Sequence, residues 1–191
     1  MSRPRGLRVI AGTARGRRLV APDGDHVRPT KDIAREAMFS ALDARGRLDG
    51  ASVLDLYAGT GALAIEALSR GAGSAVLVEW DRTALAAIRT NVEVLDDDVR
   101  VEIVARDARR FLAGGPPPDA PFDLVFVDPP YNTPDEEITA VLAAVAAAGW
   151  LAADGIVSVE RPVRHPAVVP PGLSNGWERS FGDTLLTFLF R

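Results

Sequence analysis

The sequence predicts an α/β protein built on a mostly parallel sheet, and three observations lead to this prediction. From residue 51 onward, short runs rich in Val, Leu and Ile alternate with longer segments of helical periodicity. A glycine turn, "AGTG" at 58–61, joins the first run to the first helix. The fourth run ends in "DPPY" at 128–131, where prolines stop the sheet ladder. Such alternation is typical of parallel sheets covered by helices on both faces.

The segment ahead of that sheet is expected to form a small extension. Strand-like runs at 7–12 and 17–22 predict an N-terminal β-hairpin around "TARG". A helix is predicted over 28–46, with Thr30 as its N-cap and a stripe of Ala, Met and Leu along one side.

The remaining elements follow in chain order. The expected strands cover 52–57, 75–81, 100–108, 122–131 and 155–160, and the expected helices cover 61–71, 82–95 and 135–149. Residues 161–176 are proline-rich and are expected to form a loop. Two apolar runs around "GD" at 182–183 then predict a C-terminal antiparallel hairpin that closes the sheet edge.

Composition limits the class of protein. The chain has 191 residues, 47% of them hydrophobic and 25% charged, as in an ordinary soluble domain. It contains no cysteine, which excludes disulfides and cysteine nucleophiles and suits the reducing cytoplasm. The start lacks the apolar core of a signal peptide, and the longest apolar run, at 138–153, is broken by Gly149. We therefore expect a cytoplasmic protein without a membrane span. His26 and His165 are isolated in the sequence, so no metal site is expected.

Positive charge is concentrated at the start of the chain. Residues 1–47 hold 11 Lys and Arg against 5 Asp and Glu, whereas 48–191 hold 11 against 21. One interpretation is the solvated surface of an arginine-rich protein. The other is a basic arm for a phosphate backbone, attached to a less basic catalytic body. Charge alone does not decide between them.

The glycine turn lies where open parallel sheets bind nucleotide-like ligands, beyond the carboxyl end of the first strand. Glu79 stands 20 residues after Gly59, so a dinucleotide-binding turn, and with it a nicotinamide-dependent oxidoreductase, is an alternative. Asp55 argues against a pyrophosphate, because a carboxylate beside a helix N-terminus disfavours a second anion. S-adenosylmethionine carries no phosphate and offers an ammonium and a sulfonium instead. We assign Gly59 and Gly61 to close backbone approach and Asp55 to the methionine moiety. Glu79 would accept hydrogen bonds from both ribose hydroxyls.

Asp107 follows the third predicted strand and has Ala108 beside it. In this position it is placed to accept a hydrogen bond from the adenine amino group of the same cofactor. An acid in a surface loop is the alternative interpretation.

The "DPPY" stretch suits a clamp for an amino group on a planar ring. Asp128 supplies one acceptor and the Pro129 carbonyl a second, so that the nitrogen lone pair of an exocyclic amine is aimed at a methyl donor. Pro130 stiffens the backbone, and Tyr131 offers a ring face on which a base can stack. A base inside a duplex would first be flipped out. The alternative is a turn that ends a strand and exposes a tyrosine, and the glycine turn favours the clamp.

Two stretches resemble those of known methyltransferases. "VLDLYAGTGALAIEALSRGA" with "DPPY" resembles the Rossmann-like methyltransferases that act on amino groups. "RVIAGTARGRRL" with "VRPTKDIAREAMFSAL" is similar to the 16S ribosomal RNA guanine-N2 methyltransferases, the RsmD family. The resemblance covers nearly the whole chain. It implies a Rossmann-like methyltransferase fold with a seven-stranded sheet, S-adenosylmethionine as cofactor, and a guanine N2 of small-subunit ribosomal RNA as target.

The resemblance also implies roles for individual residues. For the cofactor these are Asp55, Gly59, Gly61, Glu79 and Asp107, and for the target base Asp128, Pro129, Pro130 and Tyr131. Arg28, Pro29 and Thr30 match a segment near the cofactor and RNA entrance. Our candidates for phosphate contact, taken as a group, are Arg8, Arg15, Arg17, Arg18 and Arg35. The chain is accordingly divided into an RNA-binding extension at 1–47 and a methyltransferase domain at 48–191.

Several functions stay open from one sequence. Methylation of adenine N6 or cytosine N4, in DNA or in another RNA, would use the same clamp on a different ring. The nicotinamide-dependent oxidoreductase and a non-catalytic RNA-binding module come from other classes. The expected partner is ribosomal RNA within a small-subunit assembly intermediate, and a monomer is the simplest oligomeric state.

Overall fold

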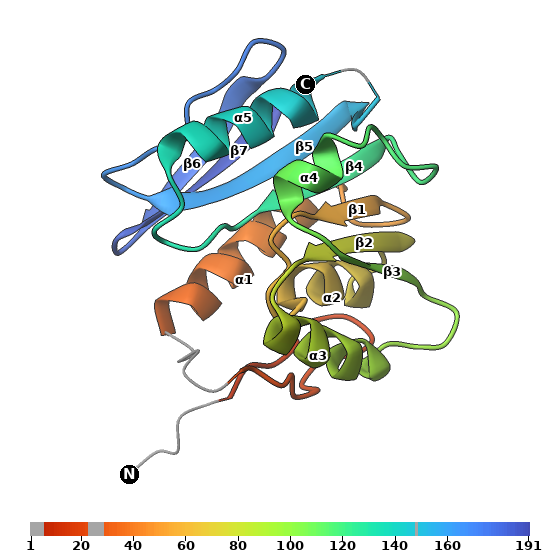
Figure 1. Ribbon diagram of the computed structural model, residues 1–191. Helices are drawn as coiled ribbons and strands as arrows, with labels where there is room; N and C mark the ends of the chain where they lie inside the picture. Colours follow the sequence, from red (N-terminus) through yellow and green to blue (C-terminus); the bar gives the residue numbers. More distant parts are fainter. Residues whose placement is uncertain (1–5, 23–28, 148) are drawn as a thin grey trace.

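One seven-stranded sheet runs through the protein (Figure 1). The computed structural model describes residues 6–22, 29–147 and 149–191. The strand order is β3-β2-β1-β4-β5-β7-β6, in which the first five strands of the chain are parallel and β6 and β7 form an antiparallel hairpin beside β5. The strands are β1 Ser52–Asp55, β2 Ser74–Glu79, β3 Arg100–Ala105, β4 Phe122–Val127, β5 Leu151–Pro162, β6 Ser174–Phe181 and β7 Thr184–Phe190. This arrangement confirms the predicted fold class.

Helices cover both faces of the sheet. They are α1 Pro29–Asp43, α2 Ala62–Ser69, α3 Arg82–Asn91, the 3-10 helix η1 Val92–Val94, α4 Ala108–Leu112 and α5 Asp135–Ala146. Buried side chains of α1, α2 and α3 share one apolar core with the sheet, and those of α4 and α5 share the other. The central strands are therefore apolar on both faces, which explains their continuous hydrophobic runs.

Two helix starts differ from the sequence prediction. The helix α1 begins at Pro29, a residue favoured at the first helical position, so Thr30 lies inside the first turn and is not the N-cap. The predicted strand at 100–108 is too long, because Asp107 caps a short helix, α4, that the sequence analysis did not predict. The Asp107 carboxylate accepts a hydrogen bond from the Arg110 backbone N–H at 3.1 Å.

The first described residues form a short, irregular antiparallel hairpin that is docked on α2 (Figure 1, red). One bridge joins Arg8 and Arg18, and next to it the Leu19 N–H donates to the Leu7 carbonyl at 2.9 Å. The buried carboxylate of Glu66 accepts the N–H groups of Ile10 and Ala11 at 2.7 and 3.0 Å. Because these amides bond to a side chain of α2, they are not available to extend a strand ladder.

The last three strands are longer or begin earlier than predicted. β5 extends from Leu151 to Pro162, because it pairs with β4 at one end and with β7 at the other. β6 begins at Ser174, so the predicted loop at 161–176 is shorter at both ends. No helix in the described part of the chain is both long enough and apolar enough to cross a membrane.

Candidate functional site

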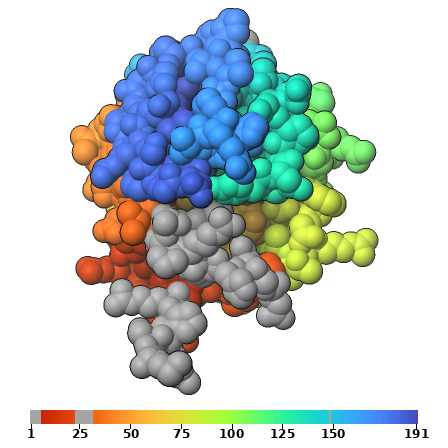
Figure 2. Space-filling view, turned by 90° about the vertical axis from the view of Figure 1, so that its left-hand side faces the viewer, coloured from red at the N-terminus to blue at the C-terminus, as the bar shows by residue number. Residues whose placement is uncertain are grey.

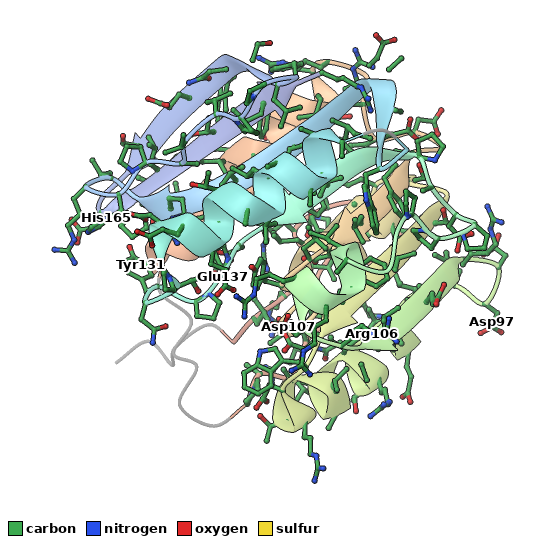
Figure 3. All side chains as sticks on the ribbon, turned by 45° about the horizontal axis from the view of Figure 1, so that its top comes forward. Asp97, Arg106, Asp107, Tyr131, Glu137 and His165 are labelled. Carbon is green, nitrogen blue, oxygen red and sulfur yellow. The ribbon has the colours of Figure 1, made fainter. Side chains whose placement is uncertain are left out.

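A cavity of about 690 Å³ opens at the carboxyl ends of the central parallel strands. β1 lies between β2 and β4, and Asp55 at its end is in register with Leu77 and Phe126. The turns that follow these three strands therefore meet at one edge of the sheet. In Figure 3, Tyr131, Glu137 and Asp107 lie along this edge, whereas Asp97 lies far from it. Open parallel sheets bind ligands in this position.

The two glycines of the turn after β1 have different surroundings. Both adopt positive φ angles, 55° at Gly59 and 77° at Gly61. A Cβ on Gly61 would lie 3.0 Å from the Leu77 side chain, so this glycine permits close packing of α2 on β2. A Cβ on Gly59 would have only the Tyr57 carbonyl within reach, at 3.9 Å, and Gly59 lines the cavity. Of the two glycines, Gly59 is therefore the one that allows close approach of a ligand. Gly61 is not among the described cavity-lining residues.

Glu79 holds the glycine turn in place. Its carboxylate accepts the Gly59 N–H at 2.8 Å through one oxygen and the N–H groups of Trp80 and Asp81 through the other. A carboxylate has about four lone-pair sites, so three backbone bonds leave limited capacity for further donors. Glu79 lines the cavity, where a residue that meets a ribose is expected.

Asp55 lies beneath the cavity and is not among its described lining residues. The side chain is 1% exposed; Oδ2 accepts the Ala64 N–H at 3.3 Å, and Oδ1 is buried without a hydrogen-bond partner. Burial, followed by the nearby charge of Asp128, raises the pKa of Asp55 to about 8. A cation placed above the glycine turn would favour the ionised form, so this site is suited to a positively charged ligand.

Asp107 and Ala108 line the cavity on the side of β3 and α4. Asp107 is the N-cap of α4, and this capping role is an alternative reason for an acid there. Beside it, Glu137 of α5 lies 3.4 Å from the Tyr57 hydroxyl and 3.7 Å from the Arg109 guanidinium. Burial and the Glu137 carboxylate raise the pKa of Tyr57 above its ordinary value, so the phenol stays protonated. These contacts join the turn after β1 to α4 and α5 around one end of the cavity.

The loop after β4 brings Asp128, Pro129, Pro130 and Tyr131 to the cavity wall. Tyr131 is 42% exposed, and its hydroxyl lies 3.5 Å from the Asp183 carbonyl in the turn between β6 and β7. The loop is also supported from β5. The buried Arg161 donates to the Thr133 carbonyl at 3.1 Å and to the Asp135 carboxylate at 2.6 Å. Hydrogen bonds of these side chains thus fix the loop to the C-terminal strands.

The predicted RNA-contact residues fall into three groups. Arg15, Arg17 and Arg18 are exposed. Arg8 is half-buried and donates to the Gly16 carbonyl at 2.7 Å, and Arg35 is buried at 8% exposure, which removes it from the outer surface. Arg28 lies outside the described residues. Of Pro29 and Thr30 the structure describes only the helical backbone.

Several cavity residues were not predicted. Trp80 is 68% exposed and lines the cavity next to Glu79. Its position directly after a strand-end acid is a sequence signal that could have identified it. Glu137 and Glu160 also line the cavity, but they come from distant elements, α5 and β5, so no local pattern indicates them. Among the described lining residues, six are acids and three are arginines, which favours a ligand with cationic and hydroxyl groups.

Comparisons with known proteins agree with this geometry. Residues 7–190 match the protein family described as conserved hypothetical protein 95. Ribosomal RNA small subunit methyltransferase D of Escherichia coli strain K12 is 39% identical over 159 residues, which are 83% of this chain and 76% of that protein. YlbH of Bacillus subtilis strain 168 is 34% identical over 165 residues, 85% of this chain and 88% of YlbH. A solved structure of yhhF from Escherichia coli matches with a TM-score of 0.83 at 32% identity and covers 97% of each chain.

Proposed function

This chain belongs to the family described as conserved hypothetical protein 95, and on that premise we propose that it methylates ribosomal RNA of the small subunit with S-adenosylmethionine as donor. Its fold is the Rossmann-like methyltransferase fold expected from the sequence. The finer proposal is that the methyl group goes to the exocyclic N2 amino group of a guanine in 16S ribosomal RNA. The observation that supports methyl transfer to an amino group is the shared cavity, which Asp128 lines together with Gly59 and Glu79, and the choice of guanine N2 follows from the resemblance of the sequence to the RsmD family.

The cavity residues fit the donor. Gly59 leaves room for close approach of the ligand to the turn after β1. Glu79 would accept one ribose hydroxyl in addition to its three backbone N–H groups, and Asp107 with Ala108 would meet the adenine. Asp55 lies beneath the turn, where its buried oxygen compensates positive charge above it. When bound there, S-adenosylmethionine supplies a methyl group on a cationic sulfur.

The target amino group would be held at the tip of β4. Asp128 and the Pro129 carbonyl would each accept a hydrogen bond from one of its two N–H groups. These two bonds would turn the nitrogen lone pair toward the methyl carbon. With the donor bound, the nitrogen would attack the methyl carbon and sulfur would keep the electron pair of its broken bond. Asp128 or water would then take the extra proton from nitrogen. The half-exposed ring of Tyr131 supports the base from one side.

The first 47 residues would contact the RNA. The exposed side chains of Arg15, Arg17 and Arg18 are suited to phosphate oxygens. Leu7 and Ala21, at the two ends of this loop, line the cavity, so RNA bound by the loop would lie near the target site. We therefore keep the division into an RNA-binding part at 1–47 and a methyltransferase domain at 48–191. A small-subunit assembly intermediate is the proposed substrate.

Methyl transfer can be assigned to an atom directly. The protein is incubated with methyl-labelled S-adenosylmethionine and small-subunit particles from a strain that lacks the gene, and the RNA is digested to nucleosides. We expect label in N2-methylguanosine. Label only in N6-methyladenosine or N4-methylcytidine would reject the guanine assignment, and thermal stabilisation by NAD but not by S-adenosylhomocysteine would reject a methyltransferase altogether.

Asp128→Ala separates the clamp from the cofactor site. In this proposal Asp128 binds the amino group of the target base. The substitution should therefore lower kcat by at least about 100-fold, as expected for loss of a charged group that orients the nucleophile. The Kd for S-adenosylhomocysteine, measured by calorimetry, should change by less than about threefold. Parallel losses of kcat and cofactor affinity would show that Asp128 does not act on the base alone.

A further inference from the structure

Arg35 of α1 is a buried cation at the wall of the cavity. It is 8% exposed, and it shares the cavity lining with Leu7 and Ala62, which follows the glycine turn. The two other arginines among the described lining residues, Arg106 and Arg109, lie on the side of β3 and α4. Arg35 therefore places a guanidinium group at the end of the cavity nearest α1 and the start of α2, where its ion-pair partner Asp32 also lines the cavity.

The hydrogen-bonding capacity of Arg35 is only partly used. One terminal nitrogen donates to the Arg8 carbonyl at 2.8 Å and to the Asp32 carboxylate at 3.1 Å. Nε is buried without a hydrogen-bond partner. Burial lowers the pKa of Arg35 from its ordinary value, although Asp32 and Glu66 oppose that shift. A buried guanidinium with an unused N–H group is stabilised by an anion that enters the cavity.

We infer that Arg35 binds the α-carboxylate of the methionine moiety of S-adenosylmethionine. The inference rests on the proposed function and adds an anion-binding residue to the cofactor site. It also gives the cofactor a direction. The adenosine lies toward Glu79 and Asp107 at the ends of β2 and β3, and the amino-acid end lies toward α1.

A terminal carboxylate fits this place better than an RNA phosphate. The guanidinium group presents parallel N–H donors that match the two oxygens of a carboxylate. A phosphodiester is linked to a sugar on each side and requires an open surface, which a side chain at 8% exposure does not offer. Arg35 is therefore separated from Arg15, Arg17 and Arg18, which are exposed and remain candidates for RNA contact.

The test compares two ligands that differ by one group. S-adenosylmethionine and its decarboxylated form both carry the sulfonium and the amine, and only the first has the carboxylate. In Arg35→Ala, the Kd for S-adenosylmethionine should rise by roughly 10- to 100-fold, the range for a lost charge-assisted bond. The Kd for the decarboxylated ligand should stay within about twofold of wild type. Arg35→Lys, which keeps the charge, should fall between wild type and Arg35→Ala.

Controls separate binding from folding. Arg45, also an arginine but exposed beyond the end of α1, provides the matched variant Arg45→Ala, which should leave both Kd values unchanged. If Arg35→Ala does not fold, the same two-ligand comparison is made on Arg35→Lys. Equal losses for both ligands, or a loss of RNA affinity alone, would overturn the assignment to the carboxylate. Wild-type protein that binds neither ligand would overturn the proposed function and this inference together.

Discussion

Asp55 is a residue at which stability and ligand binding are opposed. Its carboxyl group is buried, one oxygen has no hydrogen-bond partner, and Asp128 and Glu79 add negative charge nearby. A buried polar atom without a partner lowers stability, and an apolar side chain would pack there without this loss. Such a residue is understandable where a cation binds, because the ligand supplies the compensation that the fold does not.

The raised pKa of Asp55 predicts how stability depends on pH. Its pKa rises from 3.8 in the unfolded chain to about 8 in the folded protein, so between these values the folded state holds a proton that the unfolded state has released. The free energy of unfolding should therefore fall as pH rises from 4 to 8, by up to about 1.4 kcal/mol per pH unit. Asp55→Asn should remove this dependence, so urea midpoints of the two proteins should diverge between pH 5 and pH 8.5. Parallel midpoints across that range would contradict the burial effect.

Sequence reasoning at the residue scale located side chains better than it assigned their roles. The spacing of Gly59 and Gly61 predicts a tight turn, and both have positive φ angles. Spacing does not show which atoms a Cβ would meet. Both glycines were therefore predicted to allow close approach of a ligand to the backbone. Only Gly59 faces the cavity, whereas Gly61 faces Leu77 in the core. The distinction depends on packing between α2 and β2, which no local pattern contains.

At the scale of elements, the N-terminal loop and α2 act as one unit. Ser69 donates its hydroxyl hydrogen to the Ala11 carbonyl at 2.6 Å and accepts the Ala14 N–H at 3.0 Å. Its own carbonyl accepts the Thr13 N–H at 2.8 Å. Asn91 of α3 bonds both backbone groups of Val20 and the carbonyl of Thr60 in the glycine turn. The loop that carries the exposed arginines is thereby linked to the glycine turn after β1.

Two glycines of this loop allow the docking to be tested. Gly12 and Gly16 have φ angles of 82° and 81°, so alanine at either position is strained by about 1–2 kcal/mol. A Cβ at Gly12 would lie 1.7 Å from the Ser69 carbonyl oxygen, whereas at Gly16 nothing lies within 4 Å. Gly12→Ala should therefore lower the unfolding free energy by several kcal/mol more than Gly16→Ala. Both are measured by urea denaturation, and equal losses would mean that the loop does not pack tightly on α2.

Elements were predicted well where a local sequence pattern defines them. They were predicted less well where contacts with distant segments set their bounds. The buried parallel strands and α2, α3 and α5 follow from apolar runs and helical periodicity. α4 was missed because it is a short helix fixed by the Asp107 cap. The hairpin predicted at 7–22 forms with only one bridge, because Glu66 and Ser69 of a distant helix bind part of its backbone. The full length of β5 depends on pairing with β7, more than twenty residues along the chain.

At the scale of the whole molecule, charge and shape are arranged around the cavity. The described N-terminal residues and the C-terminal strands occupy opposite ends of the face in Figure 2. Acids predominate among the described lining residues, while exposed arginines lie on the loop docked against α2. The acids of the cavity are thus separate from the arginines of the loop. This separation would let a cationic cofactor and an anionic polymer bind the same protein, because each would meet charge of the opposite sign.

The salt dependence of RNA binding tests this separation. Replacing Arg15, Arg17 and Arg18 together by alanine should weaken binding and reduce the slope of log K against log salt by about 2, since each phosphate contact on single-stranded RNA contributes roughly 0.7. The Kd for S-adenosylhomocysteine should not change.

The matched control removes the same charge from surface positions outside the N-terminal loop. Arg45, Arg100 and Arg179 are exposed, and none of them is among the described cavity-lining residues. Their triple alanine variant should keep the wild-type slope, because a net loss of three charges acts weakly beyond a Debye length of about 10 Å. Equal reductions in both variants would mean that overall charge attracts the RNA. A reduction confined to the first variant would place the phosphate backbone on the N-terminal loop, of which Leu7 and Ala21 line the cavity.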